Sequence, residues 1–489
     1  MKPYNLLVLI ILVFTITSCN NSGNLNLDVS DKALLIHSAN VIDVTDGTVL
    51  EDKAILIDNG TIQSIGKYSD LKSLVSSNNE IDANDKFIIP GLWDMHLHIE
   101  GDDLVEDNKA LFPVFIAYGI TTVRDMASDL GEQVLAWRKD IEQDKFLGPQ
   151  IFTAGRKLEG INSIWKGDLE IASEEELQQM LDKLEDYDVD LVKITENTLS
   201  GELFLKSVTQ AKQRGFLVSS HVPIDLSINE LADAGLSSIE HASYLLRLGV
   251  NEDSVVQQIR SGAMTKSEAN QFYSSNFNQD TAIEAYNNLS KSGIAVAPTL
   301  IGGKQLAYLD EDNHADDEFL DYLTDRFTSN YQWRIDRMTN DTQEQKEARK
   351  DRYQLIAKQL PYIQEAGIPI LAGSDAAALN TFVYPALALH EELVLFQTAG
   401  LTPLQILQSA TINGAKFMGK SSSMGTIETG KQADMVILNS NPLLDIKSTQ
   451  DIFSVFNDGE YFDREDLDAL LEQAKKTKQE LDMKRNSSN

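Results

Sequence analysis

The chain has 489 residues and a formal net charge of −33, from 75 acidic against 42 basic residues. Such a charge repels nucleic-acid phosphates over most of the surface, and no basic run offsets it, so we expect no nucleic-acid partner. With 42% hydrophobic and 24% charged residues, the composition is that of a globular protein and excludes a wholly disordered chain. The single cysteine excludes an internal disulfide and a thiolate metal cluster.

Residues 1–19 have the pattern of a secretory signal. A weakly basic start precedes the apolar run LLVLIILVFTI at 6–16, which is too short to span a bilayer as a helix. The sequence ITSC that ends at Cys19 resembles a bacterial lipoprotein lipobox, which implies cleavage of residues 1–18, lipid attachment to Cys19 and a tether at 19–32. The alternative is an ordinary cleaved signal, or a membrane anchor, with an unrelated cysteine nearby. We therefore expect a membrane-anchored lipoprotein of the bacterial cell envelope, outside the cytoplasm.

Two segments far apart in the sequence have the pattern of short antiparallel strands. In residues 33–86, alternating apolar runs flank the Asn-Gly pair at 59–60, a strong hairpin signal. In residues 420–462, a second hairpin pattern centres on the NDG sequence at 457–459. A β unit divided between both ends of the chain is most simply one domain, so we predict a small β-sandwich domain formed from both termini. The amphipathic segment 463–489 predicts a C-terminal helix.

Between these segments, residues 87–419 alternate short apolar runs with helical patterns. Eight strands separated by helices favour a parallel sheet of the α/β class, and this number predicts a closed (β/α)8 barrel that resembles a TIM barrel. The predicted strands are 87–90, 121–124, 150–154, 191–194, 217–220, 238–240, 295–299 and 369–372. Insertions at 242–294 and 301–368 follow the sixth and seventh strands. We expect them either to cover the site or to be helical extensions without a role in binding.

Six side chains that could bind metal or catalyse a reaction lie at the ends of predicted strands. His96 and His98, two residues apart just past the first strand, point to the same face in extended geometry and can share one cation. The others end later strands: Lys193, His221, His241 and Asp375. Because the C-terminal strand ends of a barrel converge on one axis, we expect all six to meet in space. Three histidines fall outside this pattern: His37, His314, which we place in an inserted helix, and His390.

Each of these residues also has a purely structural interpretation. Lys193 could form an ordinary salt bridge, Asp375 could be a helix N-cap, and the pair His221 and His241 could lie in the core. Imidazole and carboxylate ligands without thiolate favour Zn²⁺, with Mn²⁺, Co²⁺ or Fe²⁺ as alternatives. A lysine ammonium cannot bind a cation, so Lys193 would have to lose its proton and react with CO₂ to become an anionic bridge.

The sequence resembles the amidohydrolase superfamily of metal-dependent hydrolases. The resemblance is carried by PGLWDMHLH at 90–98, GITTVRD at 119–125, VKI at 192–194, His221, Glu240-His241, GSDA at 373–376 and the segment from LTPLQ to NSNP at 401–442. It implies a (β/α)8 barrel flanked by a β-sandwich domain and a centre of two divalent metal ions, most simply Zn²⁺. By position, it implies that His96, His98 and Asp375 bind the more buried metal, that His221 and His241 bind the second, and that a carbamate on Lys193 bridges them.

This ligand set implies hydrolysis of a C–N bond through a metal-bridging hydroxide, with Asp375 as the base that takes the proton and returns it to the leaving amine. The motifs look most like the imidazolonepropionase-related and Xaa-Pro-dipeptidase-like group, so we expect a dipeptide or N-acyl amino acid as substrate. Alternatives are a cyclic amide or imidazolone, or a lactone or ester. A mononuclear deaminase is disfavoured because no carboxylate lies three residues after His221. Arg124 and Tyr244 are candidate substrate contacts; an ion pair of Arg124 with Asp125 and a packed aromatic are the alternatives.

A function of another class stays open at this point. The chain could be a lipid-tethered binding protein on an inactive hydrolase scaffold. Loss of catalysis usually leaves gaps in a ligand set, however, and none of the six positions is missing. The sequence leaves the native metal, the oligomeric state and the membrane leaflet undetermined.

Overall fold

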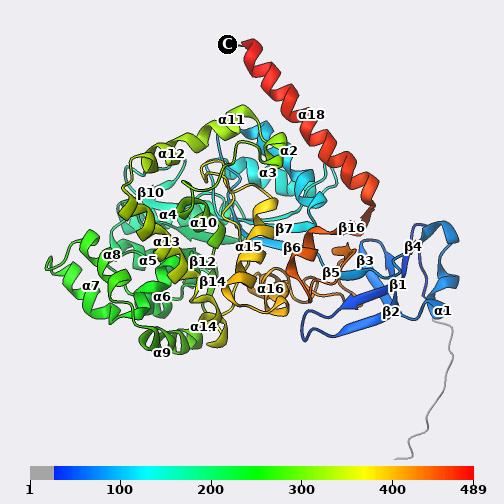
Figure 1. The fold of residues 1–489 in the computed structure, drawn as a ribbon, viewed down its shortest axis with the longest axis horizontal. Coiled ribbons are helices and arrows are strands. Elements are labelled where there is room, and N and C mark those ends of the chain that lie inside the picture. The colour runs from blue at the N-terminus through cyan, green and yellow to red at the C-terminus, as the bar shows by residue number, and fades with distance from the viewer. Residues whose placement is uncertain (1–26, 489) are drawn as a thin grey trace, which may run out of the picture.

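The computed structural model describes residues 27–488, so the predicted signal, Cys19 and most of the tether lie outside the described residues. A barrel surrounded by helices occupies the centre of the molecule, and a sheet domain lies at one end (Figure 1). Within residues 27–488, no helix combines the length and the apolarity needed to cross a membrane.

An eight-stranded sheet takes its strands from both ends of the chain. Its order is β17-β16-β15-β5-β1-β2-β3, with β4 beside β1. The strands are β1 (Leu34–Ile42), β2 (Val49–Asp58), β3 (Thr61–Gly66), β4 (Glu80–Asp82), β5 (Phe87–Pro90), β15 (Met435–Leu438), β16 (Ile452–Asn457) and β17 (Glu460–Phe462). Strand β5 pairs with β1 on one side and with β15 on the other, so N-terminal and C-terminal strands form one sheet. The predicted sheet domain from both termini is confirmed.

The two hairpin turns predicted from Asn-Gly and Asp-Gly pairs contact each other. Asn59 and Gly60 connect β2 to β3 with φ of 47° and 73°, the left-handed conformation that tight hairpins require. Asp458 and Gly459 connect β16 to β17 with φ of 50° and 78°. A Cβ atom on Gly459 would lie 2.4 Å from the Cα of Gly60. Both glycines are therefore required by backbone conformation, and Gly459 also by the close approach of the two turns.

Eight parallel segments form the barrel, which confirms the predicted fold class. They are β6 (Leu92–Leu97), β7 (Ile120–Asp125), β8 (Gln150–Thr153), β11 (Leu191–Ile194), β12 (Leu217–Ser220), β13 (Ser238–Glu240), β14 (Ala295–Ala297) and the extended segment 369–372. Strands β6, β7 and β8 pair in parallel in that order, and so do β11, β12, β13 and β14. Backbone hydrogen bonds from Asp190 to Thr153 and from Met95 to Ala372 close the ring. Strands β9 (Leu158–Gly160) and β10 (Leu169–Ile171) extend the sheet beside β11.

The first and last barrel strands differ from the prediction. The predicted first strand, 87–90, is β5 of the terminal sheet, and β6 is the first barrel strand. Only Gly91 separates the two strands, and a Cβ atom there would lie 2.1 Å from Oγ1 of Thr121. The chain thus passes from one sheet to the other without a loop that the sequence pattern could reveal. The last segment is joined to β14 by a single bridge, between Ile370 and Val296.

Amphipathic helices cover the barrel because each buries one apolar stripe. In α4 (Glu174–Asp186), the leucines at 177, 181 and 184 are buried, and the Ser173 side chain caps the helix by accepting from the Glu176 N–H. The other helices around the barrel are α2 (Val105–Ala117), α3 (Gly131–Ile141), α5 (Gly201–Gln213), α6 (Ile228–Ala234), α15 (Leu387–Ala399), α16 (Pro403–Ser409) and α17 (Ile412–Phe417). A further short helix, α1 (Tyr68–Leu71), belongs to the terminal sheet domain.

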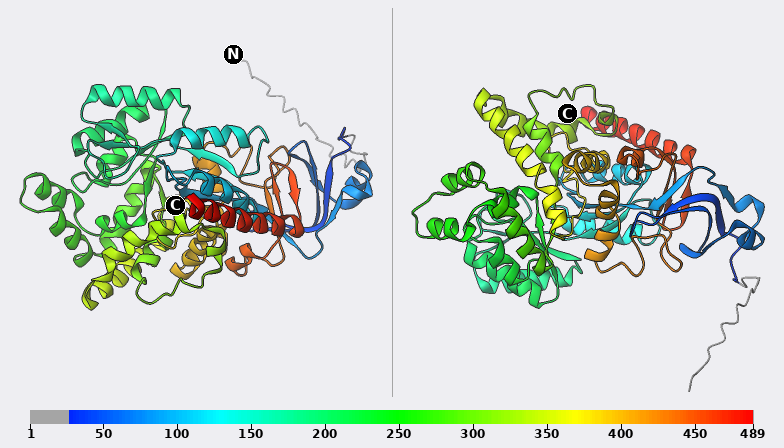
Figure 2. Two further views of the ribbon diagram at one scale, coloured as in Figure 1. Left: turned by 90° about the horizontal axis from the view of Figure 1, so that it is seen from above. Right: turned by 60° about the horizontal axis from the view of Figure 1, so that its bottom comes forward.

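Both insertions are helical. The first holds α7 (Glu252–Arg260), α8 (Lys266–Ser275) and α9 (Gln279–Leu289), and the second holds α10 (Leu300–Ala307), α11 (Asp325–Thr328), α12 (Gln332–Thr339), α13 (Gln343–Ala357) and α14 (Leu360–Glu365). Figure 2 shows the first insertion at the opposite end of the molecule from the N-terminal strands. His314 lies in the loop after α10 and not in a helix as predicted, because the chain breaks into turns there. The C-terminal helix α18 (Arg464–Ser488) packs along α2, where Arg485 pairs with Asp107.

Candidate metal centre

Four histidines meet at the C-terminal edge of the barrel. His96 and His98 lie at the end of β6, His221 follows β12, and His241 follows β13. The ring centroid of His241 lies 5.0 Å from that of His96 and 5.0 Å from that of His221. The Nε2 atoms of His221 and His241 are 3.2 Å apart. The structure therefore brings together histidines from three strands that are separate in the sequence.

Asp375 joins the histidines from the end of the last barrel segment. Its Oδ1 lies 3.4 Å from the Nε2 atoms of both His96 and His98. One ligand atom each from His96, His241 and Asp375 lies within 4.8 Å of the others, a spacing that suits one cation. Asp375 and His241 have φ of 57° and 77°, the left-handed region that is costly for residues other than glycine. Backbone strain thus accompanies two of the candidate ligands.

Each of the four imidazoles uses its Nδ1 atom in a hydrogen bond to the protein. His96 pairs with Glu240, and His221 pairs with Glu196. His98 pairs with the carbonyl of Ala127, and His241 pairs with the hydroxyl of Thr299. All four distances are 2.6 to 2.8 Å. A carboxylate or carbonyl can only accept, so the first three imidazoles donate from Nδ1 and keep the lone pair on Nε2. Metal-binding histidines are oriented in the same way. The Nε2 atom of His96 is buried and has no hydrogen-bond partner within residues 27–488, as expected for an atom that awaits a cation.

Lys193 lies in β11 with 1% of its surface exposed. Its Nζ atom is buried and has no hydrogen-bond partner in the part of the chain that the structure describes. Burial lowers the pKa of Lys193 to about 8, although the charges of Glu240 and Asp375 oppose this shift. A buried amine that loses its proton near neutral pH has the reactivity that carboxylation by CO₂ requires.

The ionisation states of two further candidate ligands, Asp375 and His241, also suit metal binding. Burial raises the pKa of Asp375, but the imidazoles of His96 and His98, both 3.4 Å from its Oδ1, outweigh this effect and hold its pKa well below the ordinary value. Burial lowers the pKa of His241 to well below its usual range, so this imidazole is neutral. An ionised carboxylate and a neutral imidazole are the forms that bind a cation. The residues present therefore fit a divalent metal centre.

Arg124 lies inside the barrel and has no exposed surface. Its Nη2 atom is 3.0 Å from Oε2 of Glu240, and its Nε atom donates to the carbonyl of Met95. Asp125, its alternative partner in the sequence, instead accepts a hydrogen bond from Thr153 at 2.6 Å. Arg124 thus forms a buried ion pair with Glu240, and its predicted contact with substrate stays a prediction.

Tyr244 lies beside the second pair of histidines. Its hydroxyl donates to Glu196 at 2.8 Å, and Glu196 also binds Nδ1 of His221 at 2.8 Å. The predicted contact of Tyr244 with substrate stays a prediction. Glu196 was missed by the sequence reasoning, although its place three residues after Lys193 put it just past a strand end.

The buried carboxylate of Asp94 connects β6, which carries His96, to the last barrel segment, which leads to Asp375. Asp94 accepts hydrogen bonds from the N–H of His96 at 3.2 Å and from the N–H and hydroxyl of Ser374 at 3.0 and 2.6 Å. The N–H of Asp375 donates to the carbonyl of His96 at 2.6 Å. These bonds set the position of Asp375 relative to β6.

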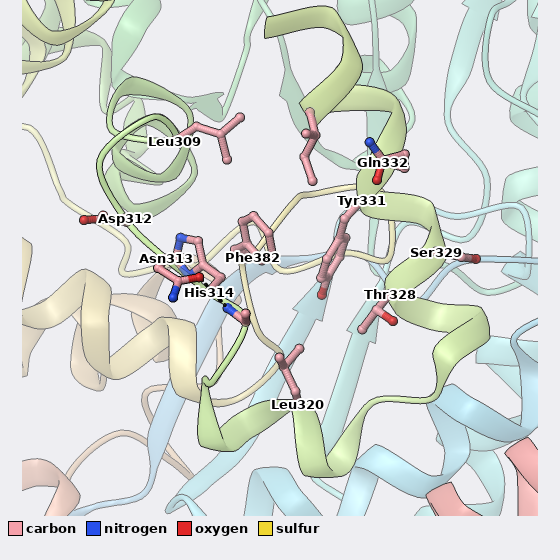
Figure 3. Close-up of a pocket in the computed structure, with 12 residues that line it drawn as sticks. Leu309, Asp312, Asn313, His314, Leu320, Thr328, Ser329, Tyr331, Gln332 and Phe382 are labelled. Carbon is pink, nitrogen blue, oxygen red and sulfur yellow. Dashed lines mark hydrogen bonds between the residues drawn. The ribbon is translucent and has the colours of Figure 1, made fainter. Parts of the chain in front are cut away.

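A cavity of about 490 Å³ lies beside the loop that follows Asp375 (Figure 3). The second insertion and Phe382 form its walls, and the ring of His314 stacks on Phe382 with the centroids 4.0 Å apart. Nδ1 of His314 binds Asp317 at 2.8 Å. His314 is thus separate from the metal centre, as predicted, and so is His390, which is buried against Thr449.

Residues 87–461 match the sequence profile of the Amidohydrolase family. A 5-methylthioadenosine/S-adenosylhomocysteine deaminase of Teredinibacter turnerae is 34% identical over 86 residues, which is 17% of this chain and 20% of the relative. An imidazolonepropionase of Thermoplasma volcanium is 30% identical over 104 residues, 20% of this chain and 25% of the relative. The chain thus spans a quarter or less of the length of these two curated relatives.

The whole fold has counterparts among solved structures. A Xaa-Pro dipeptidase with methionine bound in its active site superposes with a TM-score of 0.63 and 21% sequence identity. The superposition covers 88% of this chain and 100% of the dipeptidase. At this identity the likeness describes the fold, a barrel with an additional sheet domain.

Proposed function

The chain belongs to the amidohydrolase family, and on this premise we propose that it hydrolyses a C–N bond of a small substrate. The observation that carries the proposal is the arrangement of four imidazoles that all use Nδ1 for the protein and turn Nε2 toward a shared space with Asp375. Among the described residues, the buried Nε2 of His96 has no hydrogen-bond partner, whereas a histidine that served only the core would have one.

The proposed cofactors are two divalent metal ions, with Zn²⁺ as the best match to the donor types. His96, His98 and Asp375 would hold one ion, His221 and His241 the other, and Lys193, as a carbamate, would be common to both. When bound, the ions would supply a strongly acidified water and would polarise the scissile carbonyl. The unpartnered Nζ of Lys193 and its lowered pKa support this role.

Asp375 is the proposed general base and acid. Its Oδ1 faces His96 and His98, and a Cβ atom on Gly302 of α10 would lie 3.9 Å from its Oδ2. An ionised carboxylate in that position can accept a proton from the attacking water and deliver it to the leaving nitrogen. His96 and Ser374 keep the carboxylate in place through the hydrogen bonds to its strand.

The proposed substrate is a dipeptide or an N-acyl amino acid. The superposition on the Xaa-Pro dipeptidase, which covers 88% of this chain, supports this class. The segment shared with an imidazolonepropionase supports a cyclic amide as the second candidate, and a lactone or ester remains a third. A deaminase is disfavoured, although one relative is such an enzyme, because Ile224 occupies the position three residues after His221.

Metal analysis followed by substrate screening tests these proposals. Purified protein should contain two divalent ions per chain and should cleave members of a panel of dipeptides, N-acyl amino acids, cyclic imides and lactones. A chelator should abolish the activity, and added metal should restore it. Metal-loaded protein that binds panel members but cleaves none of them would favour the lipid-tethered binding protein instead.

We also propose that Cys19 is lipidated and that the protein is anchored to a membrane of the bacterial envelope. The support is the lipobox resemblance alone. Several acyl chains on one cysteine anchor a protein stably, whereas a single chain does so only marginally. Mature protein should therefore partition into detergent with a lipid mass at its N-terminus, and Cys19→Ser should disturb processing or release soluble protein. Recovery of unmodified soluble wild-type protein would contradict the anchor.

A further inference from the structure

Three arginines of the described residues have no carboxylate within ion-pair distance, and all three lie in the second insertion. They are Arg334 and Arg337 on α12 and Arg352 on α13. Every other arginine between residues 27 and 488 has an Asp or Glu within 4.0 Å. In a chain with a net charge of −33, unpaired arginines indicate positions where an anion from outside the chain can bind.

Arg334 is the one of the three that is tied to the metal centre. Its Nε atom donates to the carbonyl of Leu379 at 3.0 Å, and its Nη2 atom donates to Oδ1 of Asn380 at 2.6 Å. The side-chain amide of Asn380 in turn donates to the backbone carbonyl of Asp375 at 2.6 Å. Two hydrogen bonds therefore separate this guanidinium from the backbone of the proposed base.

The guanidinium of Arg334 is held in place but keeps one donor group free. Its Nη1 atom makes no hydrogen bond to any residue that the structure describes. The side chain is half-buried, and its carbon Cζ lies 4.9 Å from the centre of the Trp333 ring, which meets the Trp165 ring edge to face with the centroids 6.4 Å apart. Burial lowers the pKa of Arg334, while the charge of Asp375 opposes this shift. The two groups therefore interact electrostatically. A preorganised guanidinium with a free N–H₂ group is well suited to bind a carboxylate.

The other two unpaired arginines are placed differently. Arg352 is exposed and donates to Ser274 at 2.6 Å. Arg337 is exposed and stacks on the ring of Trp333 at 5.3 Å, and among the described residues it has no hydrogen bond to the loop after Asp375. Arg337 thus shares the helix, the charge and the tryptophan with Arg334 but lacks the link to the metal centre, which makes it a matched control.

We propose that Arg334 is the specificity residue that binds a carboxylate of the substrate. The inference rests on the proposed function and narrows it: the substrate is a C–N compound that bears a free carboxylate, such as a dipeptide or an N-acyl amino acid, and not its amide or a neutral cyclic amide. Arg334 takes the role that the sequence assigned to Arg124. The second insertion is then part of the substrate site.

Binding of two nearly identical probes tests the assignment. N-acetyl-L-methionine and N-acetyl-L-methionine amide differ only in the charged group, and their affinities for the metal-loaded protein can be compared by calorimetry. The wild type and Arg337→Met should bind the acid about tenfold or more tightly than the amide, as a charge-assisted hydrogen bond predicts. In Arg334→Met the two affinities should become equal because the acid binds more weakly while the amide is unaffected. Arg334→Gln, which can still donate to Leu379, should behave in the same way and serves if the Met variant does not fold.

Three results would overturn the assignment. The first is a wild type that does not prefer the acid, or that binds neither probe. The second is a preference for the acid that persists in both Arg334 variants. The third is an equal loss of acid and amide binding in both variants. The last result would identify Arg334 as a purely structural residue. Because the measurement needs no turnover, a protein that prefers the acid but hydrolyses nothing would refute the proposed function and leave the role of Arg334 intact.

Discussion

The Nδ1 atom of His96 lies 2.6 Å from Oε2 of Glu240, and neither side chain has any exposed surface. The same carboxylate accepts hydrogen bonds from Arg124 at 3.0 Å and from the hydroxyl of Ser238 at 2.5 Å. Glu240 therefore links a candidate metal ligand on β6 to a buried cation on β7. A buried charged network therefore contacts the metal centre at His96.

Replacing Glu240 with alanine should lower the free energy of unfolding by about 3–5 kcal/mol, because Arg124 is left as a buried charge without a partner. Metal affinity should fall by about 10- to 100-fold, since His96 loses the acceptor that orients it. Urea denaturation and metal titration measure the two effects. Glu132→Ala is the control, because its partner Arg156 lies near the surface and such pairs contribute about 0–1 kcal/mol. Similar losses in both variants would show that the buried network is not important for stability.

Replacing Lys193 with alanine should reduce the metal content from two ions per chain to one. The reason is that the second ion loses the proposed bridging carbamate, and short carboxylic acids should partly restore it. Metal analysis measures the loss, and native mass spectrometry of the wild type should show the added mass of a carbamate. Lys416→Ala, at an exposed lysine, should keep both ions. A fully loaded and fully active Lys193→Ala protein would refute the binuclear centre.

Replacing Asp375 with asparagine should leave much of the metal bound but should lower kcat by about 10²- to 10⁴-fold, the usual contribution of a general base. Asparagine keeps a carbonyl oxygen for the cation but cannot accept the proton. Steady-state kinetics with the best substrate, together with metal analysis, separate the two effects. If the variant retains two metals and a kcat within about threefold of wild type, Asp375 serves only as a ligand.

His390 should make the protein less stable in acid. This residue is buried on α15, and burial lowers its pKa to about 4, against an ordinary value of 6.5. Between these two pH values the unfolded chain binds a proton that the folded protein does not, so stability present above pH 6.5 is lost as the pH falls toward 4. The loss attributable to His390 is about 3 kcal/mol.

His390→Gln tests this effect, because glutamine can still bond to Thr449 but does not titrate. The difference in unfolding free energy between wild type and variant should change by about 3 kcal/mol between pH 7 and pH 4. Urea denaturation at several pH values provides the measurement. Parallel curves for the two proteins would exclude His390 as a source of the acid sensitivity.

The residues that meet at the barrel edge could be predicted from the sequence because their placement follows from strand order. His96, His221 and Asp375 each end a parallel strand, and the fold alone brings strand ends together. The partners of these residues could not be predicted in the same way. Whether Glu196 or Glu240 supports a histidine depends on which way a side chain turns across the barrel, and a single sequence does not contain that information.

The boundary between the two domains was harder still to predict. Strands β5 and β6 are adjacent apolar runs with one glycine between them, so periodicity cannot show that Pro90 and Leu92 belong to different sheets. Arg334 was also missed. Its helix has no strand nearby in the sequence, and its link to Asp375 passes through Asn380 by contacts that arise only in the folded chain.

The sheet built from both ends of the chain imposes an order on folding during synthesis. When β5 leaves the ribosome, it can pair with β1, but its other edge has to wait until Met435–Leu438 is made, after the entire barrel. An unpaired edge strand is a site where a second chain can attach. One edge of β5 therefore stays unpaired for most of translation. Strand β15 covers this edge only when about the last tenth of the chain is being added. Truncations that remove the C-terminal strands should accordingly aggregate through β5, even though the barrel itself would be complete.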